Sequence, residues 1–154
     1  MDQYLLSDKI LFNERPDAVP YNYRISYKIA QIVLILFKCG GRSSCSLVKI
    51  SIIAMSLYTP NNQEVLIRLI NNEATIPIIR LDPSINRALL IAIADALVVQ
   101  MKNEKFGLTP KGKLLANKIL NDPELMKDEK KFLDKISLNL TEQKIESIIK
   151  SWGN

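Results

Sequence analysis

Four proline pairs along the chain constrain its fold more than any other feature. In each, proline follows a threonine or an aspartate: Thr59-Pro60, Asp82-Pro83, Thr109-Pro110 and Asp122-Pro123. At the start of a helix, a threonine or aspartate oxygen accepts hydrogen bonds from backbone N–H groups that have no other partner. Proline suits the next position, because the N–H that it lacks would be unpaired there. The four pairs therefore predict four helix starts.

Apolar residues recur between these pairs with helical spacing. Ile29, Ile32, Val33 and Leu36 follow the i, i+3, i+4, i+7 pattern, which favours a helix over a strand. Ser44 or Ser46 is the expected cap of the next helix. The predicted helices span about residues 25–38, 45–58 or 47–58 (according to which serine is the cap), 60–70, 83–96, 110–120, 123–136 and 141–152, and residues 76–80 are expected to be extended.

Two short strands are predicted around residues 98–100 and 106–108, joined by a basic turn. The fold class is therefore mainly α with a small β-hairpin. Helices followed by a hairpin and a capped helix are in the order of a winged helix-turn-helix domain, with the hairpin as the wing and residues 83–96 in the place of the recognition helix. We divide the chain into an N-terminal arm (1–23), a winged-helix domain (24–121) and a C-terminal helical extension (122–154).

Composition excludes several kinds of chemistry. The 154 residues contain no histidine, which removes Ser-His-Asp and Cys-His catalysis and histidine-ligated metals. The two cysteines, Cys39 and Cys45, cannot form a disulfide framework or a zinc site, and we expect them to be buried or half-buried thiols. We therefore expect no catalytic residues, no metal and no cofactor. No signal peptide or membrane-spanning segment is recognisable, so we expect a soluble, cytoplasmic protein.

Positive charge is concentrated in and after the predicted hairpin. The net charge is +5, and Lys102, Lys105, Lys111 and Lys113 are accompanied by few acids. Lysines of this kind can bind DNA phosphates without reading base sequence, which predicts a DNA-backbone contact at the wing. The alternative is that these lysines only solvate the surface of the turn and of the helix that follows.

The predicted helix over residues 83–96 is too apolar for a helix that reads bases. A helix that is apolar nearly all round is buried on more than one side. We therefore expect Arg87, Leu90 and Ile91 to contact a protein partner. The alternative is that the N-terminal helices complete the burial within the monomer. Asp95 is expected to form a structural ion pair with Arg80 or Arg87.

The last helix predicts a second docking surface. Ile145, Ile148, Ile149 and Trp152 follow the same i, i+3, i+4, i+7 spacing, with charged residues on the opposite face. Tryptophan is a frequent anchor of protein interfaces, so these residues are candidate partner contacts. The alternative is that this helix folds back on its own domain.

About residues 20–120 resemble the small middle component of bacterial ABC-three-component antiphage defence systems, including the Lamassu type. The resemblance is strongest over residues 77–88, Pro-Ile-Ile-Arg-Leu-Asp-Pro-Ser-Ile-Asn-Arg-Ala. It implies a non-catalytic subunit beside an SMC-like or Rad50-like ATPase and an effector, usually a nuclease. The Arg-x-Asp-Pro segment of the family maps onto Arg80, Asp82 and Pro83, which adds Arg80 to the expected partner contacts.

Two functions follow as hypotheses. The first is a winged-helix subunit of an antiphage complex that bridges or regulates the ATPase and its nuclease, with the wing near DNA. The second is a free-standing winged-helix transcriptional regulator. An enzyme is not expected, because no arrangement of catalytic side chains is present in the sequence.

Overall fold

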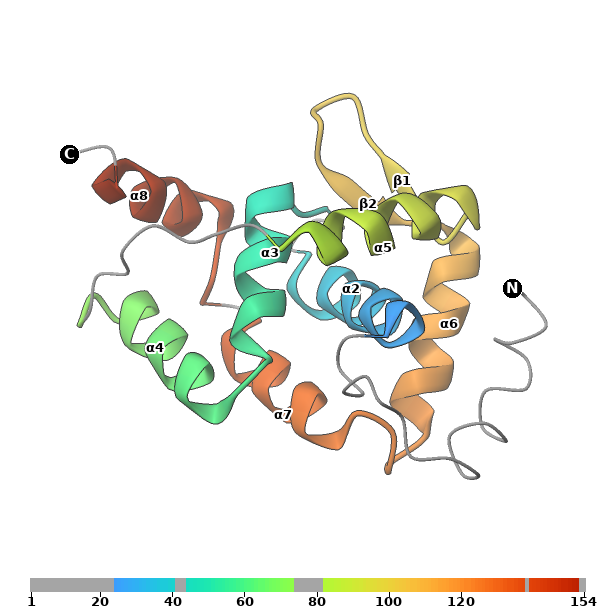
Figure 1. The fold of residues 1–154 in the computed structure, drawn as a ribbon, viewed down its shortest axis with the longest axis horizontal. Coiled ribbons are helices and arrows are strands. Elements are labelled where there is room, and N and C mark those ends of the chain that lie inside the picture. The colour runs from blue at the N-terminus through green and yellow to red at the C-terminus, as the bar shows by residue number, and fades with distance from the viewer. Residues whose placement is uncertain (1–23, 41–43, 74–81, 138, 153–154) are drawn as a thin grey trace.

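The computed structural model describes residues 24–40, 44–73, 82–137 and 139–152. The predicted N-terminal arm and the predicted extended segment over 76–80 lie outside these residues. The described residues form seven helices and one two-stranded sheet (Figure 1). The helices are α2 (Ile25–Cys39), α3 (Leu47–Ser56), α4 (Pro60–Ile70), α5 (Pro83–Ala94), α6 (Pro110–Asn121), α7 (Lys127–Ile136) and α8 (Glu142–Trp152). The prediction of a mainly helical fold with one hairpin is confirmed.

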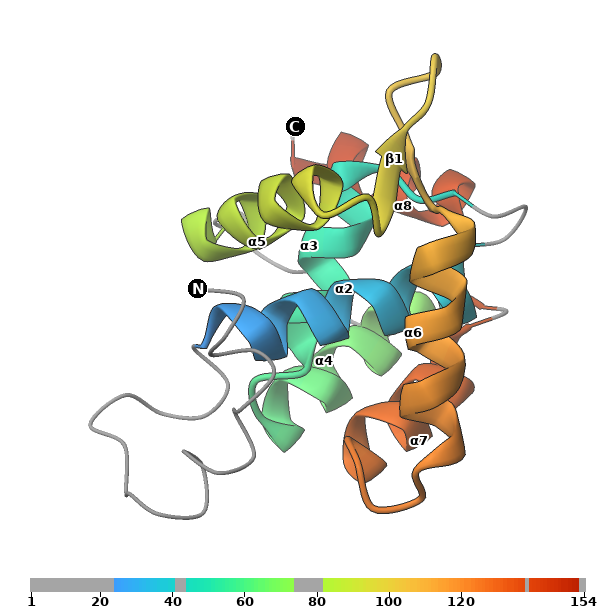
Figure 2. The ribbon, with the colours of Figure 1, turned by 90° about the vertical axis from the view of Figure 1, so that its right-hand side faces the viewer.

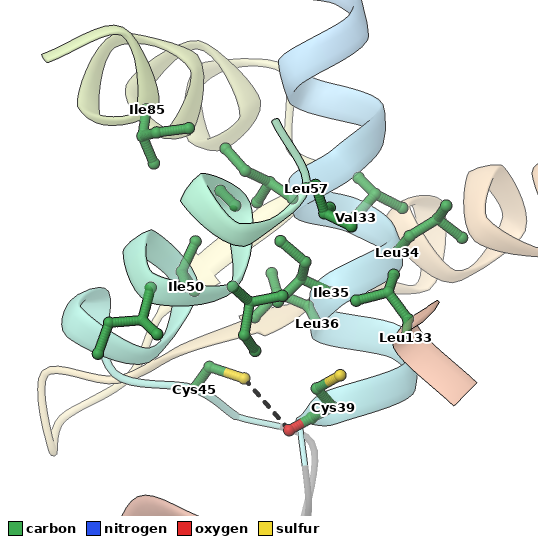
Figure 3. Close-up of a cluster of buried hydrophobic side chains, with 14 of the residues drawn as sticks. Val33, Leu34, Ile35, Leu36, Cys39, Cys45, Ile50, Leu57, Ile85 and Leu133 are labelled. Atoms are coloured by element: carbon green, nitrogen blue, oxygen red, sulfur yellow. Dashed lines mark hydrogen bonds between the residues drawn. The ribbon is translucent and has the colours of Figure 1, made fainter. Parts of the chain in front are cut away.

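Helix α2 lies at the centre of the molecule. It packs against α3, α5, α6 and α7, and against one strand of the hairpin. Ile32, Val33, Leu34 and Ile35 are four consecutive residues and all are completely buried. A helix that is buried all round needs apolar residues on every face, which explains the unbroken apolar run from Ile32 to Leu36. Figure 3 shows its side chains between those of α3 and Leu133 of α7.

The hairpin consists of β1 (Val98–Gln100) and β2 (Phe106–Leu108), which pair antiparallel with Val99 opposite Gly107. On its other side, β2 forms an isolated antiparallel bridge between Phe106 and Cys45, with backbone hydrogen bonds of 2.8 Å in both directions. The bridge places Cys45, just before α3, beside β2. The tip of the hairpin extends away from the helices (Figure 2).

Three of the four predicted proline-pair caps are confirmed. Thr59, Asp82 and Thr109 each accept a backbone N–H of the helix that follows, with proline in its first turn. The prediction for Asp122-Pro123 is wrong, because residues 123–126 form a turn and α7 begins only at Lys127. Met126 has a left-handed backbone (φ 52°), which interrupts the helical path before Lys127.

The C-terminal helices share the core of the preceding helices. Phe132, Leu133 and Ile136 of α7 are buried in the same cluster as the side chains of α2. The Lys38 ammonium lies 2.5 Å from the Asp134 carboxylate, which joins the end of α2 to α7. Helix α7 is therefore packed on the central helix.

Candidate partner and nucleic-acid surface

Helix α5 has one buried face and one exposed face. Ile85, Ala88, Leu89 and Ala92 are buried, and α5 packs chiefly against α2. The described helices therefore cover α5 on one face only, and the alternative in which the N-terminal helices complete its burial is not seen among the described residues. At the edges of the buried stripe Ile91 and Ile93 are half-buried, and Ala94 is exposed, so the remaining apolar residues form no second packed face.

The exposed face of α5 combines polar and apolar side chains. Asn86 and Arg87 are exposed near its start, and Leu90 follows one turn later with 67% of its surface accessible. Ile91 is half-buried beside it. Covering a leucine of this exposure would contribute about 1.5–3 kcal/mol to binding. The face can therefore receive a partner whose surface offers an apolar pocket and a hydrogen-bond acceptor for the guanidinium.

The predicted partner of Asp95 is not found in the described part of the chain. Arg80 lies outside the described residues, and Arg87 forms no ion pair with any described carboxylate. Asp95 is the C-terminal cap residue of α5. Its backbone carbonyl accepts a hydrogen bond of 2.9 Å from the Lys111 ammonium. A lysine at this position neutralises the negative end of the helix dipole.

The two lysines of the predicted wing differ in exposure. Lys102 is exposed in the hairpin loop and Lys105 is half-buried where the loop returns to β2. The loop is held by hydrogen bonds from Met101 N–H to the Lys105 carbonyl and from Lys105 N–H to the Asn103 side chain. The loop is therefore an ordered turn that projects positive charge away from the body of the protein.

Lys111 and Lys113 belong to the first turn of α6, beside the hairpin. The contacts made by Thr109 and Gly112 explain the sequence pattern Leu-Thr-Pro-Lys-Gly-Lys. Thr109 caps α6 through Gly112 N–H and donates its hydroxyl to the Ala96 carbonyl at 2.5 Å. A Cβ at Gly112 would lie 2.1 Å from the Leu97 carbonyl oxygen, so only glycine allows this close approach. The pattern therefore has a structural role, with Lys113 exposed and Lys111 bound to the end of α5.

Helix α8 packs on its own chain. Ile145 and Ile148 are 2% and 6% exposed, and the Glu142 carboxylate accepts the Ser46 backbone N–H at 2.9 Å. That N–H belongs to the cap residue of α3, so α8 completes the start of another helix. The structure follows the alternative in which the last helix folds back, and Ile145 and Ile148 are core residues rather than free contacts.

The other two expected contacts of α8 differ from this pair. Ile149 is 38% exposed and stays accessible at the edge of the helix. Trp152 is the last residue of α8, and its side chain lies outside the described part of the structure.

A buried polar network at the start of α5 was not predicted from the sequence. The Lys28 ammonium, on α2, donates to the Tyr58 hydroxyl at 2.8 Å and lies 3.7 Å from the Asp82 carboxylate. Tyr58 in turn donates its hydroxyl to Asp82 Oδ2. Lys28 is completely buried. A lysine between apolar residues on α2 was the available signal, but nothing in the sequence showed which residues face it.

The pKa values of this network follow from its setting. Burial lowers the pKa of Lys28, and the neighbouring Asp82 charge opposes that effect. Burial alone would raise the pKa of Asp82, but hydrogen bonds from Tyr58 and from Ser84 N–H, together with the Lys28 charge, hold it below its ordinary value. Asp82 is therefore ionised at neutral pH and can serve Lys28 as a counter-ion.

The cysteines offer no reactive thiol. Cys39 and Cys45 are free and buried, as predicted, and the Cys45 thiol donates to the Cys39 carbonyl at 3.5 Å (Figure 3). Burial raises the pKa of Cys39 to about 11 and that of Cys45 to about 12. Thiols with such pKa values are poor nucleophiles at neutral pH. Among the described residues, no three Cys, Asp or Glu side chains gather as a metal site.

A groove of about 500 Å³ lies on another face, between the end of α3, the start of α4 and α7. Its walls mix both signs of charge, with Glu64, Asp128 and Glu129 opposed by Lys131 and Lys135. This lining gives no net charge preference and brings together no nucleophile with a base. The groove therefore defines no particular ligand.

Comparison with known proteins gives no relative from which to transfer a function. No protein-family model, curated protein or solved structure matches the chain. Within the described residues, no helix is both long and apolar enough to cross a membrane.

Proposed function

We propose that the chain is a winged-helix protein. The support is the chain order of α2, the Cys45 bridge, α3, α5 and the β1–β2 hairpin, with β2 between β1 and Cys45. A winged helix has a first helix, a short strand, two further helices and a hairpin to which the short strand pairs. In this assignment α5 is the recognition helix, the hairpin is the wing, and α4 is an insertion between α3 and α5.

The protein acts as a non-catalytic subunit that binds other proteins through α5. The observation that carries this proposal is the exposed Leu90 on the helix that would otherwise enter a DNA groove. A large apolar side chain pressed against phosphates gains little, whereas a protein pocket removes it from water. The resemblance of residues 77–88 to the middle component of ABC-three-component defence systems supports an SMC-like or Rad50-like ATPase and an effector nuclease as the partners.

Co-expression with the products of neighbouring genes tests this function. An SMC-like ATPase should co-purify with the wild-type chain and be lost with Leu90→Asp. Leu114→Asp is the matched control, because Leu114 is a leucine of similar exposure, 65%, on a different helix, α6. Retention of the ATPase by Leu90→Asp, or equal loss with both variants, would contradict the proposal.

One observation favours the alternative, a free-standing transcriptional regulator. Asn86 and Arg87 are exposed near the start of α5, and these side-chain types can read adenine and guanine in the major groove. The first turn of a recognition helix is where such contacts occur. A sequence-specific footprint of the isolated protein, abolished by Arg87→Ala, would establish this function in place of the first. Weak binding without sequence preference would reject it.

A further inference from the structure

The start of α5 is attached to two other helices by directional polar contacts. The Asp82 carboxylate uses one oxygen, Oδ1, to accept Ser84 N–H at 2.9 Å, which caps α5. Its other oxygen, Oδ2, accepts the Tyr58 hydroxyl and lies 3.7 Å from the Lys28 ammonium. Lys28 comes from α2 and Tyr58 follows the end of α3. One side chain therefore joins the first turn of α5 to both helices.

These polar contacts can fix the position and rotation of α5, which packing of its apolar face alone does not. Ile85 and Leu89 are buried against the core, but burial of apolar surface is not directional and tolerates small shifts along or around the helix axis. Hydrogen bonds weaken steeply when their angle or length changes. The first turn is thus held in one orientation by Asp82, and its exposed residues Asn86 and Arg87 follow within a turn.

We infer that Lys28 and Tyr58 act through Asp82 as positioning residues for α5, and that this network sets how the Arg87–Leu90 face is presented to a partner. The second half of this inference rests on the proposed function, because only there is that face a contact surface. The first half concerns the position of α5 within the chain and needs no partner.

The position of α5 can be measured with spin labels. Asn86→Cys on α5 and Asn117→Cys on α6 place labels at exposed sites, while Cys39 and Cys45 are buried and label poorly. We expect a narrow distance distribution in this labelled background. Adding Lys28→Met or Tyr58→Phe should broaden or shift it. The unlabelled variants should also show about tenfold faster hydrogen exchange at the Ser84 and Ile85 amides, while amides of α6 stay unchanged.

Two further variants separate positioning from general stability. Asp82→Asn keeps an oxygen that can cap Ser84 N–H but removes the charge that faces Lys28, so α5 should still move. Lys38→Met removes a different α2 ion pair, to Asp134 of α7, and should leave α5 in place. If Lys28→Met does not fold, Tyr58→Phe decides the question, since it removes only a hydroxyl.

An unchanged label distance and unchanged exchange in folded Tyr58→Phe would overturn the inference, as would an equal effect of Lys38→Met. This outcome differs from failure of the proposed function. A displaced α5 in a protein that no ATPase binds would leave the positioning role standing, whereas an undisturbed α5 in Tyr58→Phe would reject it even if the ATPase co-purifies.

Discussion

Asp82 combines two tasks that a sequence pattern treats as one. The Asp-Pro pair correctly predicts the helix cap, which one oxygen provides. The second oxygen faces Tyr58 and Lys28, 24 residues and more away along the chain. The local sequence pattern predicts the cap contact, because the cap residue and the helix it caps are neighbours in the chain. The pattern cannot predict the contact of Asp82 with Tyr58 and Lys28, because that contact depends on how α2, α3 and α5 pack together.

The lowered pKa of Asp82 predicts a loss of stability in acid. A carboxyl whose folded pKa lies below its ordinary value of 3.8 stabilises the fold above that pH. The contribution disappears as the pH falls from 3.8 through the lower folded pKa. In urea unfolding at neutral pH, the free energy of unfolding of the wild type should exceed that of Asp82→Asn by about 1–3 kcal/mol. The difference should shrink below pH 3.8, and a constant difference would contradict the assignment.

At Gly112, a tertiary contact outweighs the helix propensity that would favour another residue. Alanine is favoured over glycine inside a helix by about 1 kcal/mol. Gly112→Ala should nevertheless destabilise the protein by about 1–3 kcal/mol, because its Cβ would lie 2.1 Å from the Leu97 backbone oxygen. Thermal unfolding checks this. Asn117→Ala, on the exposed face of the same helix, is the control and should be neutral or slightly stabilising. If Gly112→Ala stabilises the protein, residue 112 does not approach the Leu97 carbonyl oxygen closely.

At the scale of elements, the sequence predicts where helices start when the cap and the following residues agree. Thr59, Asp82 and Thr109 satisfy both conditions. Asp122 has the cap residue but not the continuation, and its carboxylate only closes a turn with Glu124 N–H. The positive φ of Met126 decides where α7 begins, and no property of methionine predicts that conformation.

This difference between the proline pairs can be measured. Thr59→Ala should cost about 1 kcal/mol of stability, because Asn62 N–H loses its partner at the start of α4. Asp122→Ala should cost a few tenths of a kcal/mol, since the Asp122 side chain is exposed and accepts only Glu124 N–H in a turn. Chemical denaturation of both variants provides the test, and an equal or larger cost for Asp122→Ala would contradict the assigned helix start.

Helix α8 provides a matched pair of isoleucines. Ile145→Ala should destabilise the whole protein by about 2–5 kcal/mol, because the side chain is buried against the same core. Ile149→Ala should cost less than about 1 kcal/mol, since 38% of that residue is accessible. Equal effects in urea unfolding would mean that α8 is detached in solution, and would restore all of its isoleucines as candidates for a partner.

For the whole molecule, the sequence predicted the exposure of the hairpin lysines better than the exposure of the apolar helix faces. Lysines in a short turn between strands stay exposed in almost any packing, so Lys102 could be placed from the sequence. The exposed faces of α5 and α8 could not be placed, because α5 is apolar on nearly every side, α8 is amphipathic, and either helix could pack on its own chain or on a partner. The structure separates them, with Ile145 buried and Leu90 exposed.

The hairpin and α7 lie at opposite ends of the molecule, which allows a controlled test of DNA contact (Figure 1). If Lys102 and Lys105 contact phosphates, Lys102→Glu with Lys105→Glu should weaken binding of random-sequence duplex DNA to the chain and to its complex with the ATPase. The salt slope of log K should flatten by about two, one for each lost phosphate contact. The same charge change at Lys127 and Lys131, exposed on α7, should leave the slope nearly unaltered. Fluorescence anisotropy at several salt concentrations measures both variants. Since they share the same net charge, a slope that flattens equally in both would attribute binding to overall charge, and a slope unchanged in the wing variant would remove the wing from DNA binding.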